Sequence, residues 1–129
     1  MPIEEGDGGR TQSFLDLEFS TQSFQEVIAD VAERAVHPQF SYIVTPNVDH
    51  VVKLRTVAKT KAVPDFAKAY DSAASRLCDS RILAGLAAAF GIRLPVVPGS
   101  DLTVAVFREL LGPGRRVAIV GGNDRTIPR

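Results

Sequence analysis

The sequence predicts an α/β fold in which a mainly parallel sheet is flanked by helices. Short apolar runs rich in strand-forming residues alternate along the chain with longer segments whose apolar residues recur at helical spacing. Polar turns separate the two kinds of segment, and the connections suit right-handed crossovers between parallel strands. This alternation is typical of helices packed on the faces of a parallel sheet.

Composition places the chain among globular proteins of one domain. Its 129 residues are 45% hydrophobic and 23% charged, and 15 basic residues balance 15 acidic ones. That balance argues against a nucleic-acid partner. The sequence shows neither a membrane-spanning run nor a signal peptide. Cys78 is the only cysteine, so we expect no internal disulfide and a reducing, cytoplasmic location.

The N-terminal part predicts a tail, a strand and a helix, in that order. Residues 1–12 are polar and rich in glycine, which is typical of a flexible tail. The predicted domain covers residues 13–129 and opens with a strand over residues 13–19. Ser23 and Glu26 have capping-box spacing, and helical periodicity continues from Phe24 to about Ala35.

Residues 41–53, SYIVTPNVDHVVK, organise the rest of the chain. They read as a short strand over residues 42–44, a turn, and a helix from Val48 to about Thr56. Pro46 favours extended geometry at Thr45, and Asn47 can cap the helix. A strand that enters a helix in this way forms the carboxyl edge of the sheet, where open α/β sheets hold ligands. The alternative is that the sequence Thr-Pro-Asn, which is equally typical of an ordinary turn, binds no ligand.

The second half repeats the alternation. Residues 57–63 favour neither a longer helix nor a loop, and Pro64 suits the first position of the next helix. A short strand over residues 76–78 ends at Asp79. A helix with apolar residues from Ile82 to Phe90 then stops at Gly91.

The last predicted elements raise the question of completeness. An extended segment at residues 94–97 leads through a turn to a helix that reaches residue 111, and a strand over residues 116–120 ends at Gly121-Gly122. That strand calls for a covering helix that the sequence does not contain. We therefore expect the domain to be truncated at its C-terminus, with an open sheet that seeks a partner, including a second copy of the chain.

Polar groups and glycines follow several of these strands and should gather at one edge of the sheet. Helix N-termini at such an edge favour a phosphate or a diphosphate. The residues concerned are Thr45, Asn47, Asp79, Gly99, Ser100, Asp101, Gly121 and Gly122.

Asp79 is the strongest candidate for chemistry. A carboxylate after the apolar pair Leu77-Cys78 should be partly desolvated, which would suit a general base. The alternative is that Asp79 or Ser80 caps the following helix, and Ser100 or Asp101 should cap the next one. His50 is more simply a solvated or packed histidine. The sequence contains no Asp-x-Asp, so we expect no metal clamp of that kind.

The chain resembles the WecG/TagA/CpsF glycosyltransferase family in three segments, which occur in the same order as in the family. They are VTPNVDHVVKL, LCDSRILAGLAAAFGIRLPVVPGSDL and RRVAIVGG. The resemblance implies a Rossmann-like domain that transfers a sugar such as N-acetylmannosamine from a UDP-sugar, with inversion. The acceptor would be a hydroxyl group, often on a polyprenyl-diphosphate lipid at the inner face of the plasma membrane. It implies no cofactor and no metal, and it places the sugar transfer in cell-surface polysaccharide or teichoic acid synthesis.

The resemblance also assigns roles to residues of this chain. Asp79 matches the proposed general base, and Thr45 lies with it in the catalytic site. Thr45 and Asn47 would line the nucleotide-sugar pocket, residues 99–101 match a second binding loop, and Gly121-Gly122 match a glycine turn near the nucleotide. The rival reading is a non-catalytic nucleotide-binding or interaction domain, inactive because it is truncated.

Overall fold

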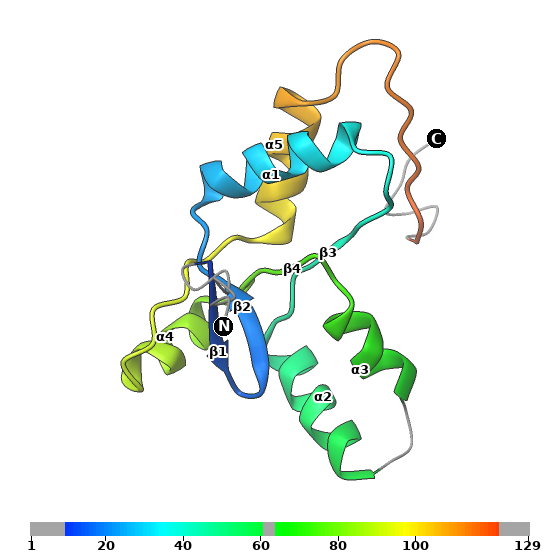
Figure 1. Cartoon of the computed structure of the whole chain (residues 1–129). Helices are drawn as coiled ribbons and strands as arrows, with labels where there is room; N and C mark the ends of the chain where they lie inside the picture. Colours follow the sequence, from blue (N-terminus) through cyan, green and yellow to red (C-terminus); the bar gives the residue numbers. More distant parts are fainter. Residues whose placement is uncertain (1–9, 61–63, 122–129) are drawn as a thin grey trace, which may run out of the picture.

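The computed structural model describes residues 10–60 and 64–121 of the chain (Figure 1). It is a mixed α/β structure with small sheets, one of them parallel. Within the described residues, the elements are β1 (Thr11–Phe14), β2 (Leu17–Ser20), α1 (Phe24–Val36), β3 (Ile43–Val44), α2 (Val48–Thr60), α3 (Pro64–Asp71), β4 (Ser75–Arg76), α4 (Arg81–Ala89) and α5 (Gly99–Glu109).

The first predicted strand is wrong in one respect, because the chain forms an antiparallel hairpin there instead of one strand. β1 pairs with β2, with Phe14 opposite Leu17. The turn between them has positive φ at both Leu15 and Asp16, which is the backbone of a type I′ turn. The sequence lacks the Asn-Gly signal for such a turn. β1 also begins at Thr11, inside the predicted tail, whereas residues 1–9 of that tail lie outside the described residues.

Three parallel segments form the centre of the molecule. β3 pairs with β4 in parallel, with Ile43 opposite Ser75, and a parallel bridge joins Cys78 to Val96 on the other side of the β4 segment. The order across this small sheet is therefore β3, β4, and the segment at Val96. The predicted parallel relationship of these segments is confirmed.

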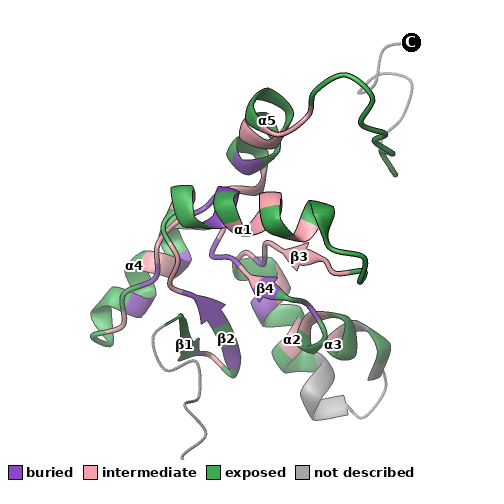
Figure 2. Ribbon diagram, turned by 45° about the horizontal axis from the view of Figure 1, so that its top comes forward, coloured by how far each residue is buried: buried purple, intermediate pink, exposed green. Residues whose placement is uncertain are grey.

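The sheet separates two apolar clusters, because neighbouring residues of a strand point to opposite faces. Leu77 belongs to the cluster formed with α1 and α5, whereas Cys78 belongs to the cluster formed with the hairpin, α2 and α4. In Figure 1, α1 and α5 lie together above β3 and β4, and α2, α3 and α4 lie below these two strands. Figure 2 shows the buried residues on β2, around β4 and on the inner sides of the helices.

Helix α1 agrees closely with its prediction. The Ser23 hydroxyl accepts a hydrogen bond from the Glu26 N–H at 3.3 Å, and the Glu26 carboxylate accepts one from the Ser23 N–H at 2.6 Å. These two bonds form the predicted capping box and satisfy backbone donors at the helix start. Val27 and Ile28 bury the apolar stripe of the helix.

Two further helices differ from expectation at their ends. α2 continues to Thr60, which resolves the first part of the ambiguous segment as helix, while residues 61–63 lie outside the described residues. α5 begins at Gly99, so Ser100 and Asp101 lie inside its first turn. Pro98 occupies the N-cap position and supplies no side-chain cap, so the prediction that Ser100 or Asp101 caps this helix is wrong.

The predicted strand over residues 116–120 does not pair in the structure. Its apolar side chains are exposed, with Ile119 at 69% and Val120 at 97% of full exposure. Figure 1 shows the segment in orange as an extended stretch after α5.

No helix within residues 10–60 and 64–121 combines the length and the apolar composition needed to cross a bilayer.

Candidate functional site at the carboxyl ends of the strands

Three loops from separate parts of the chain meet where the parallel strands end. Thr45 follows β3, Asp79 follows the β4 segment, and Gly99 follows the segment at Val96. The Asp79 Oδ1 atom accepts a hydrogen bond from the Gly99 N–H at 3.0 Å. A Cβ atom added to Gly99 would lie 3.0 Å from the Thr45 Oγ1 atom. The structure therefore brings these three predicted site residues together.

The hydrogen bonds of Asp79 and Ser80 show which of the two residues caps α4. Ser80 caps α4, because its hydroxyl accepts a hydrogen bond from the Leu83 N–H at 3.1 Å. Asp79 instead accepts a hydrogen bond from the first N–H group of α5, whose N-cap residue Pro98 supplies no side-chain cap. The carboxylate thus stabilises the N-terminus of a helix that begins twenty residues later.

Asn47 forms a reciprocal cap with His50 at the start of α2. The Asn47 Oδ1 atom accepts a hydrogen bond from the His50 N–H at 3.2 Å, and the Asn47 N–H donates to the His50 Nδ1 atom at 3.1 Å. The predicted cap by Asn47 is confirmed, and His50 is part of it. Because Nδ1 accepts a hydrogen bond, this geometry requires the tautomer that carries its proton on Nε2. The His50 ring also lies 6.2 Å from the ring of Tyr70.

The remaining predicted site residues are less closely associated with Thr45, Asp79 and Gly99. Ser100 and Asp101 are exposed in the first turn of α5, next to the Asp79–Gly99 bond. Gly121 has a φ of 107° and lies at the end of the unpaired segment. The structure records no contact between Gly121 and the three loops, and Gly122 lies outside the described residues.

Cys78 lies directly behind the site. Its side chain is fully buried, and this burial raises the pKa of its thiol above the ordinary value. The thiol donates a hydrogen bond to the Ser80 carbonyl oxygen at 3.4 Å. A buried neutral thiol packs as a small apolar side chain, so it supports the loop of Asp79 without being a nucleophile.

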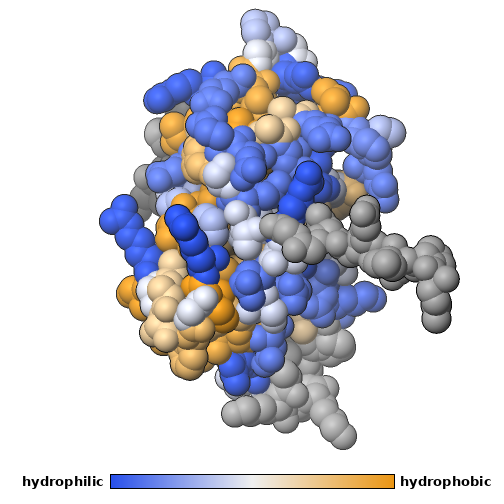
Figure 3. Space-filling model, turned by 60° about the vertical axis from the view of Figure 1, so that its left-hand side comes forward, coloured by the Kyte–Doolittle hydropathy of each residue, from blue (hydrophilic) through white to orange (hydrophobic). Residues whose placement is uncertain are grey.

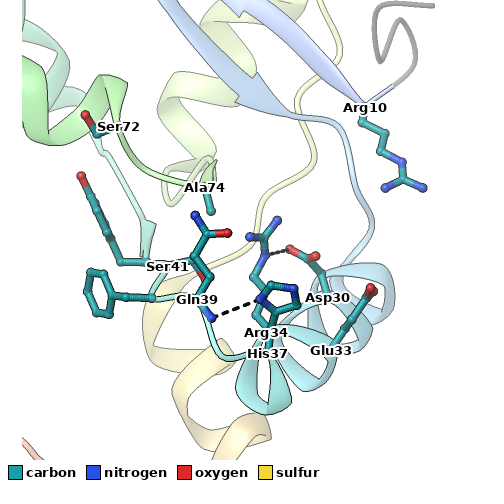
Figure 4. Close-up of a pocket in the computed structure, with 11 residues that line it drawn as sticks. Arg10, Asp30, Glu33, Arg34, His37, Gln39, Ser41, Ser72 and Ala74 are labelled. Atoms are coloured by element: carbon teal, nitrogen blue, oxygen red, sulfur yellow. Dashed lines mark hydrogen bonds and ion pairs between the residues drawn. The ribbon is translucent and has the colours of Figure 1, made fainter.

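Two cavities lie toward the opposite ends of the strands, and neither is lined by Thr45, Asp79 or Gly99. One, of about 500 Å³, is polar and is lined by side chains from α1 and from the segments before β3 and β4; Figure 4 shows Arg34 paired there with Asp30. The other, of about 650 Å³, is more apolar and lies between α1, residues 37–43 and α5. The described residues contain no cluster of three or more potential metal ligands of the His, Cys, Asp or Glu type.

Sequence reasoning missed the two contacts that hold the site together. The bond from Gly99 to Asp79 spans separate strands, and no local pattern encodes it. The glycine before Ser100 was the available signal, because a glycine at a helix start permits close approach of another loop.

The model of the Glycosyl transferase WecG/TagA/CpsF family matches residues 12–129, which is essentially the whole chain. The chain belongs to this family. Members of the WecG/TagA/CpsF family transfer sugars in the synthesis of cell-surface polymers, so this chain is a member of a glycosyltransferase family that uses a sugar donor and an acceptor. No curated protein and no solved structure gives a significant match.

Proposed function

We propose that this WecG/TagA/CpsF family member transfers a sugar from a UDP-sugar to an acceptor hydroxyl, with inversion at the anomeric carbon. The donor sugar is of the N-acetylmannosamine type. The acceptor is carried on a polyprenyl diphosphate at the inner face of the plasma membrane, where the protein acts as a peripheral enzyme. The domain is Rossmann-like, with the donor bound across the carboxyl ends of its parallel strands.

The observation that supports the proposal best is the meeting of Thr45, Asp79 and Gly99 at one edge of the sheet. An inverting transfer needs a base for the acceptor hydroxyl on one side of the sugar and stabilisation of the leaving diphosphate on the other. Asp79 is the base in this proposal. Its Oδ1 atom is held by Gly99, and the structure records no hydrogen bond of a described residue to its Oδ2 atom, which is left to approach the acceptor.

The leaving diphosphate has suitable donors nearby. The N-terminus of α5 carries Ser100 beside the Gly99 loop, and the helix dipole favours negative charge there. Asn47, Asp101 and the Gly121-Gly122 turn complete the proposed nucleotide-sugar site, in which Asp101 orients hydroxyl groups. Because this chemistry relies on helix and backbone donors, the proposal includes no metal ion and no cofactor.

The second candidate is a non-catalytic nucleotide-binding or interaction domain. It is favoured first by the Asp79 carboxylate, which already serves as the cap of α5. Apolar surface also remains exposed on α4 and at its C-cap, where Ile82 and Phe90 respectively are each more than 70% exposed. Figure 3 shows apolar side chains gathered on the lower part of the face that carries α4, which would suit a protein partner.

The experiment that separates the two candidates combines binding with turnover. Calorimetry with UDP, with and without Mg²⁺, measures nucleotide binding, and a transfer assay with UDP-N-acetylmannosamine and a lipid-linked acceptor measures catalysis. We expect UDP to bind without a requirement for Mg²⁺. Asp79→Asn keeps an oxygen for the Gly99 N–H but removes the base, so transfer should be lost while UDP binding is kept. Asp71→Asn changes an exposed carboxylate at the end of α3 and is the matched control.

Three outcomes would count against the catalytic proposal. Turnover retained by the Asp79→Asn variant would remove Asp79 from the mechanism. UDP binding by the folded protein without any transfer would favour a nucleotide-binding domain, and the absence of UDP binding would leave the interaction domain.

A further inference from the structure

The first turn of α2 is held by a capping box in which a histidine replaces the usual Glu or Gln. In the common box, the side chain at the third helical position accepts a hydrogen bond from the N–H group of the cap residue. α2 begins at Val48, so His50 occupies this third position after the cap residue Asn47. The His50 Nδ1 atom accepts the hydrogen bond from the Asn47 N–H at 3.1 Å, in the place of a carboxylate oxygen.

The same chain contains a capping box of the usual kind at the start of α1. Its third position is Glu26, whose carboxylate accepts the hydrogen bond from the Ser23 N–H. Glu26 lines a cavity with Arg10 and Glu33, and none of the three loops of the candidate site contributes to that cavity. The chain therefore uses a carboxylate for a capping box outside the site and an imidazole for the box that adjoins it.

The loop that precedes α2 contacts both neighbouring loops at the edge of the sheet. Thr45 packs against Gly99. The Pro46 carbonyl oxygen accepts a hydrogen bond from the Asp79 N–H at 3.4 Å, and the Pro46 side chain is fully buried. A change in the cap at the start of α2 would therefore shift a loop that touches Asp79 and Gly99.

The imidazole of His50 is fixed from two sides. Its Nδ1 atom is bonded to Asn47, and its ring lies 6.2 Å from the ring of Tyr70 on α3 at an angle of 42°. These values are those of a tilted aromatic pair. An Nδ1 atom that accepts a hydrogen bond carries no proton, so His50 is uncharged in this arrangement.

An uncharged side chain at position 50 matters because this edge of the sheet already carries negative charge. Asp79 and Asp101 both lie there. Asp49 is in the first turn of α2, but its carboxylate is paired at 2.7 Å with Lys53, one turn further along the helix. A glutamate at position 50 could accept the same hydrogen bond, but it would add an uncompensated negative charge to the loop. That charge would repel an anionic ligand.

We propose that His50 is a positioning residue of the nucleotide-sugar site, which fixes the Thr45–Asn47 loop without adding negative charge beside the donor. The imidazole acts through Asn47 and requires no contact with the donor. This inference rests on the proposed function, because the anionic donor is the reason that the charge at position 50 matters.

Three substitutions of His50 separate the cap from the charge. His50→Gln keeps an uncharged acceptor, His50→Glu keeps an acceptor and adds a negative charge, and His50→Ala removes the acceptor. Urea unfolding measures the cap. We expect the glutamine and glutamate variants to be as stable as the unmodified protein and the alanine variant to be less stable. Calorimetry with UDP and with inorganic pyrophosphate measures the site.

The affinities should then distinguish the two variants that keep the cap. At low salt, the affinity for both probes should stay within about twofold in His50→Gln and fall about fivefold or more in His50→Glu. The loss in His50→Glu should shrink at about 1 M salt, where charges are screened over about 3 Å. His50→Ala should bind about threefold or more weakly, because a loosened loop is competent to bind for only part of the time.

Glu26→Gln is the matched control, since it changes the charge at the corresponding position of the α1 capping box. It should leave the affinity for both probes within about twofold of the unmodified protein. A loss of affinity in this control equal to that of His50→Glu would overturn the inference, because the effect would then not be local to the loop before α2.

The remaining outcomes separate this inference from the proposed function. Equal affinities of His50→Gln and His50→Glu, or unchanged affinity in His50→Ala, would overturn the inference and leave the proposed function in place. The expected pattern of affinities without any sugar transfer would support the inference and count against catalysis. If the folded, unmodified protein bound neither UDP nor pyrophosphate, both would be wrong.

Discussion

The Asp79 carboxylate accepts a hydrogen bond from the Gly99 N–H at 3.0 Å, and this bond joins two loops that are separated in the sequence by a whole helix. The bond supplies α5 with the cap that Pro98 does not provide. A residue proposed as a catalytic base therefore also helps to hold the loop that would bind the leaving group.

Stability measurements can separate these two roles of Asp79. Asp79→Ala leaves the first N–H group of α5 without its partner, and we expect a loss of about 1 to 2 kcal/mol in the free energy of unfolding. Asp79→Asn keeps an acceptor oxygen and should lose less. Urea unfolding of the two variants and the unmodified protein gives the comparison. Equal stability of the alanine variant and the unmodified protein would show that the bond contributes nothing to the fold.

The close approach of Gly99 to Thr45 predicts a steric coupling between the two positions. In Gly99→Ala, the new Cβ would lie 3.0 Å from the Thr45 Oγ1 atom, so one of the two loops must shift. Thr45→Ala removes that oxygen and should make Gly99→Ala more tolerable, with a coupling energy of about 1 kcal/mol in a double-mutant cycle. Gly85→Ala is the control, since a Cβ there meets no atom within 4 Å. Additive effects at positions 45 and 99 would contradict the contact.

The capping box of α1 predicts a pH dependence of stability. The hydrogen bond from the Ser23 N–H, followed by the contact with the Ser23 hydroxyl, lowers the pKa of Glu26 below its ordinary value of 4.5. A carboxyl whose pKa is lower in the folded state stabilises the protein above the unfolded pKa, and this contribution is lost as the pH falls through the folded pKa. Glu26→Gln should therefore be less stable than the unmodified protein at pH 7.

The difference should shrink as the pH falls below 4.5. Denaturant unfolding at a series of pH values measures it. Glu33→Gln, an exposed substitution on the same helix, is the control. A difference between Glu26→Gln and the unmodified protein that stays constant down to pH 2 would show that the carboxylate of Glu26 does not stabilise the cap.

Local signals predicted most of the helices and the parallel relationship of the central segments. Ser23 and Glu26 marked the start of α1, Pro64 marked α3, and Asn47 marked the cap of α2. These features depend on residues a few positions apart, which is why the sequence alone reveals them. The hairpin was missed because Leu15 and Asp16 adopt positive φ without the residues that usually announce it.

The sequence by itself determined the alternation of strands and helices, the capping residues, and the family motifs that end at the loops of Thr45, Asp79 and Gly99. Only the tertiary structure decided that Asp79 caps α5 while Ser80 caps α4, and that Gly99 packs against Thr45. The physical reason is that periodicity and capping act within a helical turn. Contacts between loops depend instead on strand order and on the face of the sheet that each helix covers.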